Sequence, residues 1–473
     1  MEMYVNGAWV NAPKTAPVIS SFSGTVVDTV PIATAEQVEQ ALAAAVQGAA
    51  AMARLTGYER TQILHRAADL VAANVEDLAR TISMEEGKPL SESRGEASRM
   101  PDFLRLCAFE GTQARGETLP LDSHVGTKGK LGFTLRVPCG VVVAITPFNY
   151  PLLLVAHKVG PALAAGNAVI LKPANSTPLT ALKFTRLLIE AGLPENGIQC
   201  LTGSGAMIGP LLSADARVRK ITFTGSTEVG EQITRVAGVK KLSLELGSNA
   251  PLIILPDADL NAVAEATAVG GYVNAGQVCI STQRVLVDRK VYGDFLDALK
   301  PRVEAIKVGD PLAADTKLGA MVSEKEAQRV GAWVEEAVSQ GARVVTGGER
   351  NGAVFAPTIV ADVRPEMRIS CDELFGPAVA VTPVNTFEEA LALANDTRYG
   401  LSAGIFTQNI SHALRFAREA QSGNVHINWT PLWRADFMPY GGFKGSGIGK
   451  EGPRYAVEEM TELKTVVIHG LSA

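Results

Sequence analysis

A repeated alternation of short apolar runs and amphipathic segments between residues 168 and 246 constrains the fold more than any other feature of this sequence. The runs AVILK (168–172), KITFT (220–224) and KLSLE (241–245) have the length and β-branched content of strands, and segments with helical spacing separate them. Strands that alternate with helices at this spacing form parallel sheets through right-handed crossovers. The sequence therefore predicts an α/β fold built on a parallel sheet.

The rest of the chain extends this pattern. Apolar positions recur at helical spacing through residues 35–115, and a second α/β region runs from about 250 to 455. The segment TELKTVVIHG (461–470) resembles a strand, and it follows a glycine-rich loop, MPYGGFKGSGIGKEG (438–452). Because a terminal strand needs a partner for its edge, we expect this strand and a hairpin over 115–137 to join another subunit.

Length and charge exclude several classes of protein. A chain of 473 residues predicts two or three folded units, and a net charge of -5 argues against nucleic acid as the main partner. The N-terminus does not resemble a signal peptide, and the apolar runs are too short to span a membrane. Five scattered cysteines are typical of reduced thiols in the cytoplasm, and six dispersed histidines predict no metal site.

Two glycine turns in the alternating region suggest a nucleotide site. LTGSGAMIG contains Gly205 and Gly209, and TFTGSTEVG contains Gly225 and Ser226, each between a strand and a helix. Such turns let the backbone approach phosphate at a helix N-terminus, although one turn alone is equally consistent with a structural role. Lys172 ends a strand at the edge where α/β proteins bind ligands. Two turns in one series favour a nucleotide.

Three further residues suggest acyl chemistry. Cys279 lies in NAGQVCISTQR, Glu245 ends an apolar strand, and Asn149 lies between two prolines in TPFNYP. Taken singly, the cysteine is consistent with a packed thiol, the glutamate with an ion pair or helix cap, and the asparagine with a turn. Taken together, a nucleophile, a base and an amide donor indicate chemistry on a carbonyl carbon that loses hydride.

Seven motifs then resemble, in order, those of the NAD(P)-dependent aldehyde dehydrogenase superfamily over essentially the whole chain. They are TPFNYP, GNAVILKPA, FTGSTEVG, LELGSNAP, GQVC, DELFGP and PYGGFKGSG. The resemblance implies a Rossmann-type cofactor domain with five strands, an α/β catalytic domain and a small β extension for oligomerisation. It places the cofactor domain at 1–114 and 138–246, the catalytic domain at 247–455 and the oligomerisation strands at 115–137 and 456–473.

The resemblance also implies roles for single residues. Cys279 would be the nucleophile, Glu245 the general base, and Asn149 with the backbone N–H of Cys279 the oxyanion hole. Lys172 would bind the adenosine ribose, Gly225 and Ser226 the pyrophosphate, and Glu373 and Phe375 the nicotinamide ribose and ring. The other residues expected to line the cofactor are Thr146, Pro147, Phe148, Asn175, Gly205, Gly209 and Leu246.

The implied reaction oxidises an aldehyde to a carboxylic acid through a thiohemiacetal and a thioester on Cys279. Two departures from the family pattern bear on it. Ser248 replaces a usual second glycine after ELG, and we expect its hydroxyl to perturb the nicotinamide or base region and so to affect the rate. Asn175 stands where members that prefer NAD often have a glutamate, so no carboxylate repels a 2′-phosphate. We therefore expect the enzyme to use NAD or NADP.

The residues expected near the substrate are consistent with two classes of aldehyde. The chain resembles the branch that contains lactaldehyde, non-phosphorylating glyceraldehyde-3-phosphate and phosphonoacetaldehyde dehydrogenases. In this branch Arg105, His157 and Arg434 fall near positions that can meet an anionic or hydroxyl group, although each is equally consistent with a structural role. The apolar Val278 before the cysteine, with Ile280, Trp429 and Trp433, equally suits a small apolar or aromatic aldehyde. We expect a short hydroxy- or anion-bearing aldehyde.

Three rival functions would make different demands on these residues. A coenzyme-A-acylating dehydrogenase would resolve the thioester with a thiol, but Glu245 is suited to activating water. A silent scaffold has no need of a thiol, a base and an amide together. In a redox sensor, oxidation of Cys279 would be the signal, whereas here we expect such oxidation to be only a side effect of a reactive thiol. The expected partners are a small aldehyde and further copies of the chain, as a homodimer or homotetramer.

Overall fold

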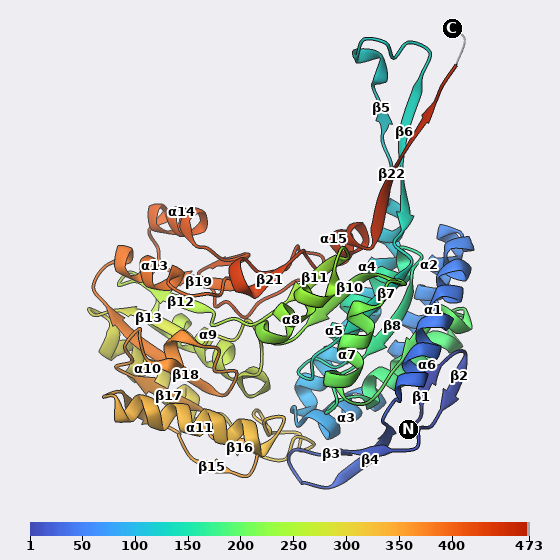
Figure 1. The fold of residues 1–473 in the computed structure, drawn as a ribbon. Coiled ribbons are helices and arrows are strands. Elements are labelled where there is room, and N and C mark those ends of the chain that lie inside the picture. Colours follow the sequence, from blue (N-terminus) through green and yellow to red (C-terminus); the bar gives the residue numbers. More distant parts are fainter. Residues whose placement is uncertain (471–473) are drawn as a thin grey trace.

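Two helix-covered sheets lie side by side, and a three-stranded arm rises from the first of them (Figure 1). The structure is a computed structural model that describes residues 1–470, so residues 471–473 of the predicted oligomerisation strands lie outside its described part. No helix within residues 1–470 is long and apolar enough to cross a membrane. The predicted α/β class is confirmed.

The first sheet has a Rossmann-type core of five parallel strands in the spatial order β9-β8-β7-β10-β11. The chain runs outward from β7 through β8 to β9 and then returns to β10 on the other side of β7. A crevice forms where such an order reverses, outside the carboxyl ends of the two strands concerned. The core strands are β7 (Val141–Ile145), β8 (Ala168–Lys172), β9 (Ile198–Cys200), β10 (Val218–Thr224) and β11 (Lys241–Glu245).

Antiparallel strands complete this sheet at both ends. The order of all eight is β2-β1-β9-β8-β7-β10-β11-β21, in which β1 pairs with β9 and β21 pairs with β11. Because β21 belongs to the glycine-rich loop near the C-terminus, this pairing brings that loop beside the end of β11. The added strands are β1 (Met3–Val5), β2 (Ala8–Val10) and β21 (Gly447–Ile448), and a separate hairpin has β3 (Thr15–Ile19) and β4 (Val26–Pro31).

The segment predicted to be helical, residues 35–115, forms four helices. Thr34 and Gln37 form a capping box at the start of the first, and Thr56 and Glu59 form one at the start of the second. The third helix ends at Gly87, whose left-handed backbone conformation (φ 91°) is common for a glycine at the C-terminus of a helix. The helices of this unit are α1 (Ala35–Arg54), α2 (Gly57–Ala73), α3 (Val75–Glu86), α4 (Leu90–Gln113), α5 (Leu153–Ala164), α6 (Leu179–Glu190), α7 (Gly205–Ala214) and α8 (Thr227–Ala237).

The second sheet has seven strands in the order β14-β17-β18-β13-β12-β19-β20, parallel except for β14. Its strands are β12 (Pro251–Ile254), β13 (Arg284–Asp288), β14 (Arg343–Thr346), β17 (Thr358–Ala361), β18 (Ala378–Val384), β19 (Ser402–Phe406) and β20 (Asn424–Ile427), beside a short hairpin of β15 (Arg350–Asn351) and β16 (Val354–Phe355). Its helices are α9 (Leu260–Tyr272), α10 (Tyr292–Glu304), α11 (Glu324–Ser339), α12 (Arg368–Cys371), α13 (Phe387–Asn395) and α14 (Ile410–Glu419).

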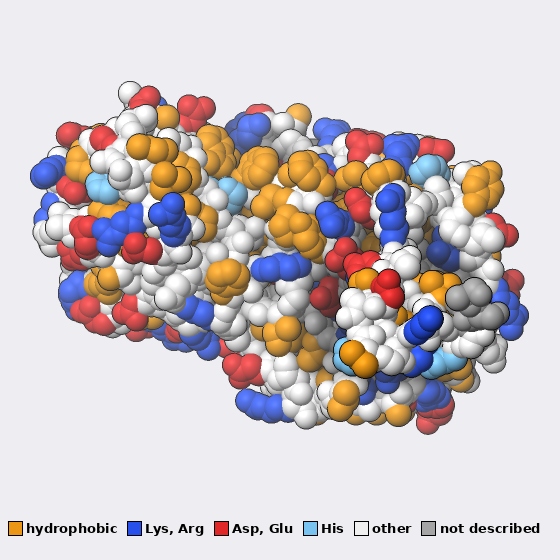
Figure 2. Space-filling model, turned by 90° about the horizontal axis from the view of Figure 1, so that it is seen from above, with side chains coloured by type: hydrophobic (Ala, Val, Ile, Leu, Met, Phe, Trp, Pro, Cys, Tyr) orange, Lys and Arg blue, Asp and Glu red, His pale blue; other side chains and the backbone are white. Residues whose placement is uncertain are grey.

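The arm consists of β5 (Thr118–Leu119), β6 (Leu131–Pro138) and β22 (Thr461–Ile468), preceded by α15 (Pro453–Glu459). Strand β22 pairs with β6 along its whole length. The predicted terminal strand and its hairpin are therefore confirmed, whereas their contact with another subunit and the domain boundaries stay predictions. Figure 2 shows the face from which the arm rises, with hydrophobic side chains gathered near its middle.

Candidate active site

A tight left-handed turn positions Cys279. Asn274, Ala275 and Gly276 follow α9 with φ values of 51°, 52° and 69°, a region that L-residues seldom adopt. A Cβ built on Gly276 would lie 2.0 Å from the backbone oxygen of Gly376, so only glycine fits there. The turn reverses the chain as it leaves α9, and Cys279 follows it at the junction of the two sheets.

Cys279 lies in a wall between two cavities. The larger, of about 460 Å³, and the smaller, of about 270 Å³, share Asn149, Leu154 and Cys279 in their linings. The larger is bordered by the loops that follow β7 and β10, at the strand reversal of the first sheet. A thiol in this place is exposed to a ligand from either side.

Six predicted cofactor residues line the larger cavity: Phe148, Gly225, Ser226, Leu246, Glu373 and Phe375. Ser226 caps α8, so the N-terminus of this helix faces the cavity. The Glu373 carboxylate accepts a hydrogen bond from the backbone N–H of Ser248 at 2.8 Å, and burial raises the pKa of Glu373 to about 7. The ring of Phe375 meets that of Phe148 edge-on at 6.0 Å.

The other predicted cofactor residues do not line this cavity but belong to the same edge of the sheet. Lys172 Nζ donates to Asn175 Oδ1 at 2.5 Å and to the oxygen of Pro173 at 2.8 Å. A Cβ built on Gly205 would lie 3.9 Å from this amine, and one on Gly209 would meet nothing within 4 Å. An open strip on α7 therefore lies next to Lys172.

Two buried hydroxyl groups lie at the same strand ends. Neither Thr146, which is followed by Pro147, nor Thr224 has a hydrogen-bond partner for its hydroxyl among residues 1–470. Buried polar atoms are normally satisfied, so these hydroxyls are suited to a ligand. With a cavity, a helix N-terminus and the Lys172 amine on one edge, the residues fit a dinucleotide.

The side chain and the backbone of Asn149 are held by separate contacts. Its Nδ2 donates to the oxygen of Gln277 at 2.7 Å, and its own backbone oxygen accepts from Lys88 Nζ at 2.6 Å and Asn274 Nδ2 at 3.0 Å. An amide carries two N–H groups, so one remains for a ligand. Lys88 is buried, and its Nζ lies 2.7 Å from a carboxylate oxygen of Glu96. Sequence reasoning missed this support because neither residue lies near a recognised motif.

Glu245 is buried at the end of β11, beside the glycine-rich loop. A Cβ built on Gly441 of this loop would lie 2.7 Å from Glu245 Oε1, and Oε2 has no partner among residues 1–470. Burial raises the pKa of Glu245 well above its usual value, and the charge of Glu451 raises it further. A carboxyl group with a raised pKa is suited to accepting a proton near neutral pH.

Glu451 has the opposite environment, and no sequence motif predicts its role. It accepts hydrogen bonds from Lys158 Nζ at 2.8 Å and Arg434 Nη1 at 3.1 Å. These two cations lower the pKa of Glu451 well below its usual range despite its burial. The pair Glu245 and Glu451 therefore combines a carboxyl that favours the proton with one that remains charged.

The nucleophile candidate also has an unpredicted neighbour. Cys279 Sγ lies 3.1 Å from the hydroxyl of Tyr440, which comes from the glycine-rich loop. Burial raises the pKa of Cys279 to about 12, whereas the hydrogen bond to Tyr440 lowers it. The motif PYGGFKGSG contains this tyrosine, but its contact depends on the path of a loop that residue types do not reveal.

Three of the four predicted substrate residues, His157, Val278 and Arg434, line the smaller cavity. The fourth, Arg105, does not: it lies 43 % exposed on α4 in ion pairs with Asp69 and Asp102. Its place in the cavity is taken by Arg99 of the same helix. Six residues advance an α-helix by about 240° around its axis, so the two arginines face different directions.

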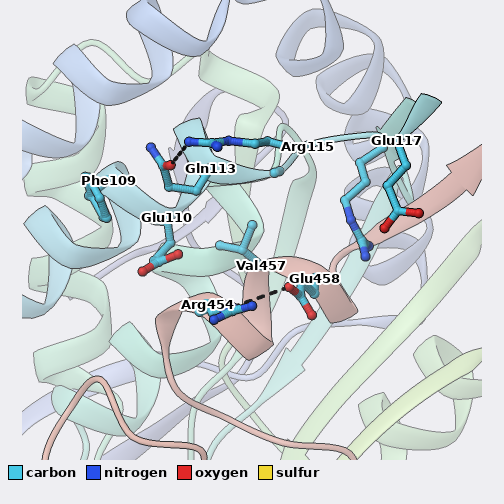
Figure 3. Close-up of a pocket in the computed structure, with 10 residues that line it drawn as sticks. Phe109, Glu110, Gln113, Arg115, Glu117, Arg454, Val457 and Glu458 are labelled. Atoms are coloured by element: carbon cyan, nitrogen blue, oxygen red, sulfur yellow. Dashed lines mark hydrogen bonds and ion pairs between the residues drawn. The ribbon is translucent and has the colours of Figure 1, made fainter. Parts of the chain in front are cut away.

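A further hollow of about 480 Å³ lies at the base of the arm (Figure 3). It is lined from α4, α15 and the arm, and its charged side chains have both signs, such as Arg454 beside Glu458 at 3.6 Å. None of the predicted site residues lines it. This hollow is therefore separate from the candidate active site.

Comparison with known proteins gives concordant results. The sequence model described as "Aldehyde dehydrogenase family" matches residues 9–466. The chain is 44 % identical over 467 residues to 3-sulfolactaldehyde dehydrogenase of Priestia aryabhattai, covering 99 % of this chain and 98 % of the relative. It is 36 % identical to lactaldehyde dehydrogenase of Methanococcus aeolicus, covering 99 % and 100 %. The crystal structure of NADP-dependent glyceraldehyde-3-phosphate dehydrogenase from Bacillus halodurans, complexed with NADP, is similar with a TM-score of 0.97 at 34 % identity, covering 99 % of both chains.

Proposed function

Because this chain belongs to the aldehyde dehydrogenase family, we propose that it oxidises a short aldehyde bearing a hydroxyl or anionic group, with Cys279 as the nucleophile. Membership makes it an oxidoreductase that acts on aldehydes with NAD or NADP. The observation that supports the role of Cys279 is its position in the wall shared by two cavities, one fitting a dinucleotide and the other open to a substrate.

In the proposed mechanism, the thiolate of Cys279 adds to the aldehyde carbon. The Asn149 side-chain N–H and the Cys279 backbone N–H stabilise the oxyanion of the thiohemiacetal. NAD or NADP, when bound, provides the acceptor for the hydride. Glu245 then takes a proton from water, whose oxygen attacks the thioester carbon, and Sγ departs as the carboxylic acid forms. Thr146, Lys172 and Ser226 are among the residues that would hold the dinucleotide.

The charges around the smaller cavity support an anionic substrate group. Arg434 and Lys158 share the single carboxylate of Glu451, which leaves one positive charge uncompensated between these three groups. His157 adds no charge, because burial holds its pKa well below the usual value. The Arg434 Nε also has no partner among residues 1–470. A relative named for 3-sulfolactaldehyde supports a substrate with both an anionic group and a hydroxyl, whereas one named for lactaldehyde supports the hydroxyl alone.

One experiment tests the nucleophile. Cys279→Ser should lose more than about 10³-fold in turnover, since a neutral hydroxyl is a far weaker nucleophile than a thiolate. A panel of aldehydes is assayed for NADH and NADPH formation, and the product is identified as acid or, with coenzyme A added, as thioester. Retained turnover in Cys279→Ser would contradict the proposal, and thioester formation would favour the acylating alternative.

A second experiment tests the substrate class. Arg434→Ala should raise KM for anionic aldehydes about tenfold or more and leave KM for neutral aldehydes of similar size nearly unchanged. Arg105→Ala is the matched control, because it removes an equally charged side chain that lies outside the cavity. If both variants keep the parental KM for every anionic aldehyde, the anionic class is wrong and an apolar substrate is favoured, as Val278 and Ile280 would allow.

We also propose that both NAD and NADP support turnover. Asn175 offers Lys172 a neutral amide oxygen instead of a carboxylate, so a 2′-phosphate meets no negative charge there. Kinetics with the two cofactors under equal conditions provide the test. A preference for NAD of more than a hundredfold in kcat/KM would contradict relaxed cofactor use.

A further inference from the structure

The hydrogen-bond partner of Cys279 Sγ is a phenol and not the candidate base. Tyr440 Oη lies 3.1 Å from Sγ, whereas no hydrogen bond joins Sγ to Glu245. A neutral thiol can donate to the phenol or accept from it, but a thiolate has no proton to give. Once Cys279 is ionised, the phenol must therefore be the donor.

The tyrosine is held firmly in this position. Its backbone pairs with that of Glu451 in both directions, with N···O distances of 3.2 Å and 2.7 Å. The side chain is 3 % exposed and packs with Val278, Ile280 and Leu401. A group whose position is fixed in advance loses little entropy when it stabilises a charge.

A cation lies over the aromatic ring. The guanidinium carbon of Arg434 lies 3.9 Å from the centroid of the Tyr440 ring. This positive charge polarises the phenol and makes its O–H a stronger donor. Arg434 is thus placed to act on the nucleophile through Tyr440 as well as on the substrate.

From these contacts we propose that Tyr440 is a further catalytic residue, whose phenol donates a hydrogen bond to the Cys279 thiolate and stabilises the anionic nucleophile. The inference rests on the proposed function, because it takes Cys279 as the attacking group. It adds a second electrostatic support to the site, on the substrate side of the thiol. The burial of Cys279 raises its pKa, and the tyrosine opposes that effect.

The test measures ionisation of the thiol without aldehyde or nucleotide. The full-length protein is alkylated with iodoacetamide over a range of pH, and the modified Cys279 peptide is quantified by mass spectrometry. Because a hydrogen bond to a charged group is lost, Tyr440→Phe should raise the pKa of the thiol by about one unit or more, which appears as roughly tenfold slower alkylation at each pH between about 7 and 10.

A control variant and a second test protein accompany this substitution. Tyr292→Phe removes a hydroxyl that bonds to Asp362, away from both cavities, and should leave the alkylation profile unchanged. Incorporation of 3-fluorotyrosine at position 440 keeps the hydroxyl and strengthens it as a donor, so alkylation between about pH 7 and 10 should become faster without a change in packing.

Unchanged alkylation rates in both Tyr440→Phe and the fluorotyrosine protein would overturn the inference. If Tyr440→Phe does not fold, the fluorotyrosine result alone decides it. These outcomes leave the proposed function intact, since the role of Cys279 fails only if Cys279→Ser retains turnover, and the substrate class fails only if Arg434→Ala keeps the parental KM for anionic aldehydes. The two failures are therefore distinguishable.

Discussion

Because Glu245 is buried, its protonation state should determine how kcat depends on pH. Since its pKa is raised well above the usual value, the carboxyl is protonated, and inactive as a base, to a higher pH than an exposed glutamate would be. We expect kcat to increase as the pH rises through this pKa. A steady-state pH profile measures it, and a kcat that stays constant from acid to alkaline pH would contradict the assignment.

Glu245→Gln separates the two halves of the proposed reaction. The amide cannot take a proton from water, so thioester hydrolysis should slow by about 10²–10⁴-fold while the first turnover remains fast. Rapid-mixing absorbance should show a burst of NAD(P)H close to one equivalent per site, followed by slow release. A variant with no burst would place Glu245 in the first half instead.

The Lys172 amine should make NADP binding weaker as the pH rises, whereas kcat should increase with pH. Burial lowers the pKa of this amine to about 8, so it is a cation below that pH and neutral above it. KM for NADP should therefore rise as the pH increases through about 8, because attraction to the 2′-phosphate is lost. Lys172→Arg keeps its charge and should abolish the rise. The same KM dependence in the arginine variant would refute this explanation.

The sequence predicts site residues whose chemical type fits the motif that contains them, such as Cys279, Glu245 and Asn149. It does not predict groups whose importance depends on a contact across the chain. Tyr440 and Glu451 lie in one glycine-rich loop, and only the pairing of that loop with the end of β11 brings them to the site. Arg105 shows the reverse case, because sequence proximity could not determine which face of α4 it occupies.

Among the elements, the turn over residues 274–276 tolerates little change. Gly276→Ala introduces a Cβ at φ 69° and 2.0 Å from a backbone oxygen. We expect a loss of at least about 2 kcal/mol in the free energy of unfolding, and a loss of activity from displacement of Cys279. Urea denaturation and turnover measure the two effects.

Gly95→Ala is the control for this substitution. Gly95 lies within α4, is exposed, and an added Cβ would meet nothing within 4 Å. Alanine there should stabilise the protein by up to about 1 kcal/mol, because it restricts the unfolded chain and favours the helix. Equal stability changes in the two variants would show that the turn is not strained as described.

The elements themselves were largely predictable from periodicity. The alternating region became β8, β9, β10 and β11 with their helices because short β-branched runs and amphipathic helices differ clearly in period. The two-strand hairpin β15–β16 and the pairing of β21 were not predicted, since two-residue strands have no period to detect. Their existence follows from tertiary contacts alone.

For the whole molecule, the exposed arm predicts assembly. Leu131, Leu135 and Leu463 are 42 %, 44 % and 58 % exposed on β6 and β22, an unusual amount of apolar surface on a projecting sheet. We propose that the arm contacts another copy of the chain. Deletion of residues 461–473 should shift the protein to monomers or aggregates in analytical ultracentrifugation, because it also exposes the edge of β6.

A point substitution tests the same interface in case the truncated chain misfolds. Leu463→Lys keeps the pairing of β22 with β6 and places a charge on the exposed face. It should weaken the oligomer without lowering the thermal stability of the isolated subunit. Oligomers of unchanged size and stability in both proteins would exclude the arm as the interface.

The glycine-rich loop has a consequence for engineering by recombination. A single covalent stretch, residues 440–468, contains the phenol beside Cys279, the carboxylate that pairs with Arg434, and the last strand of the arm. A chimera that takes its C-terminal portion from a relative therefore replaces these pocket groups and the last strand of the arm together. Exchanging one without the other requires a second crossover after Glu451.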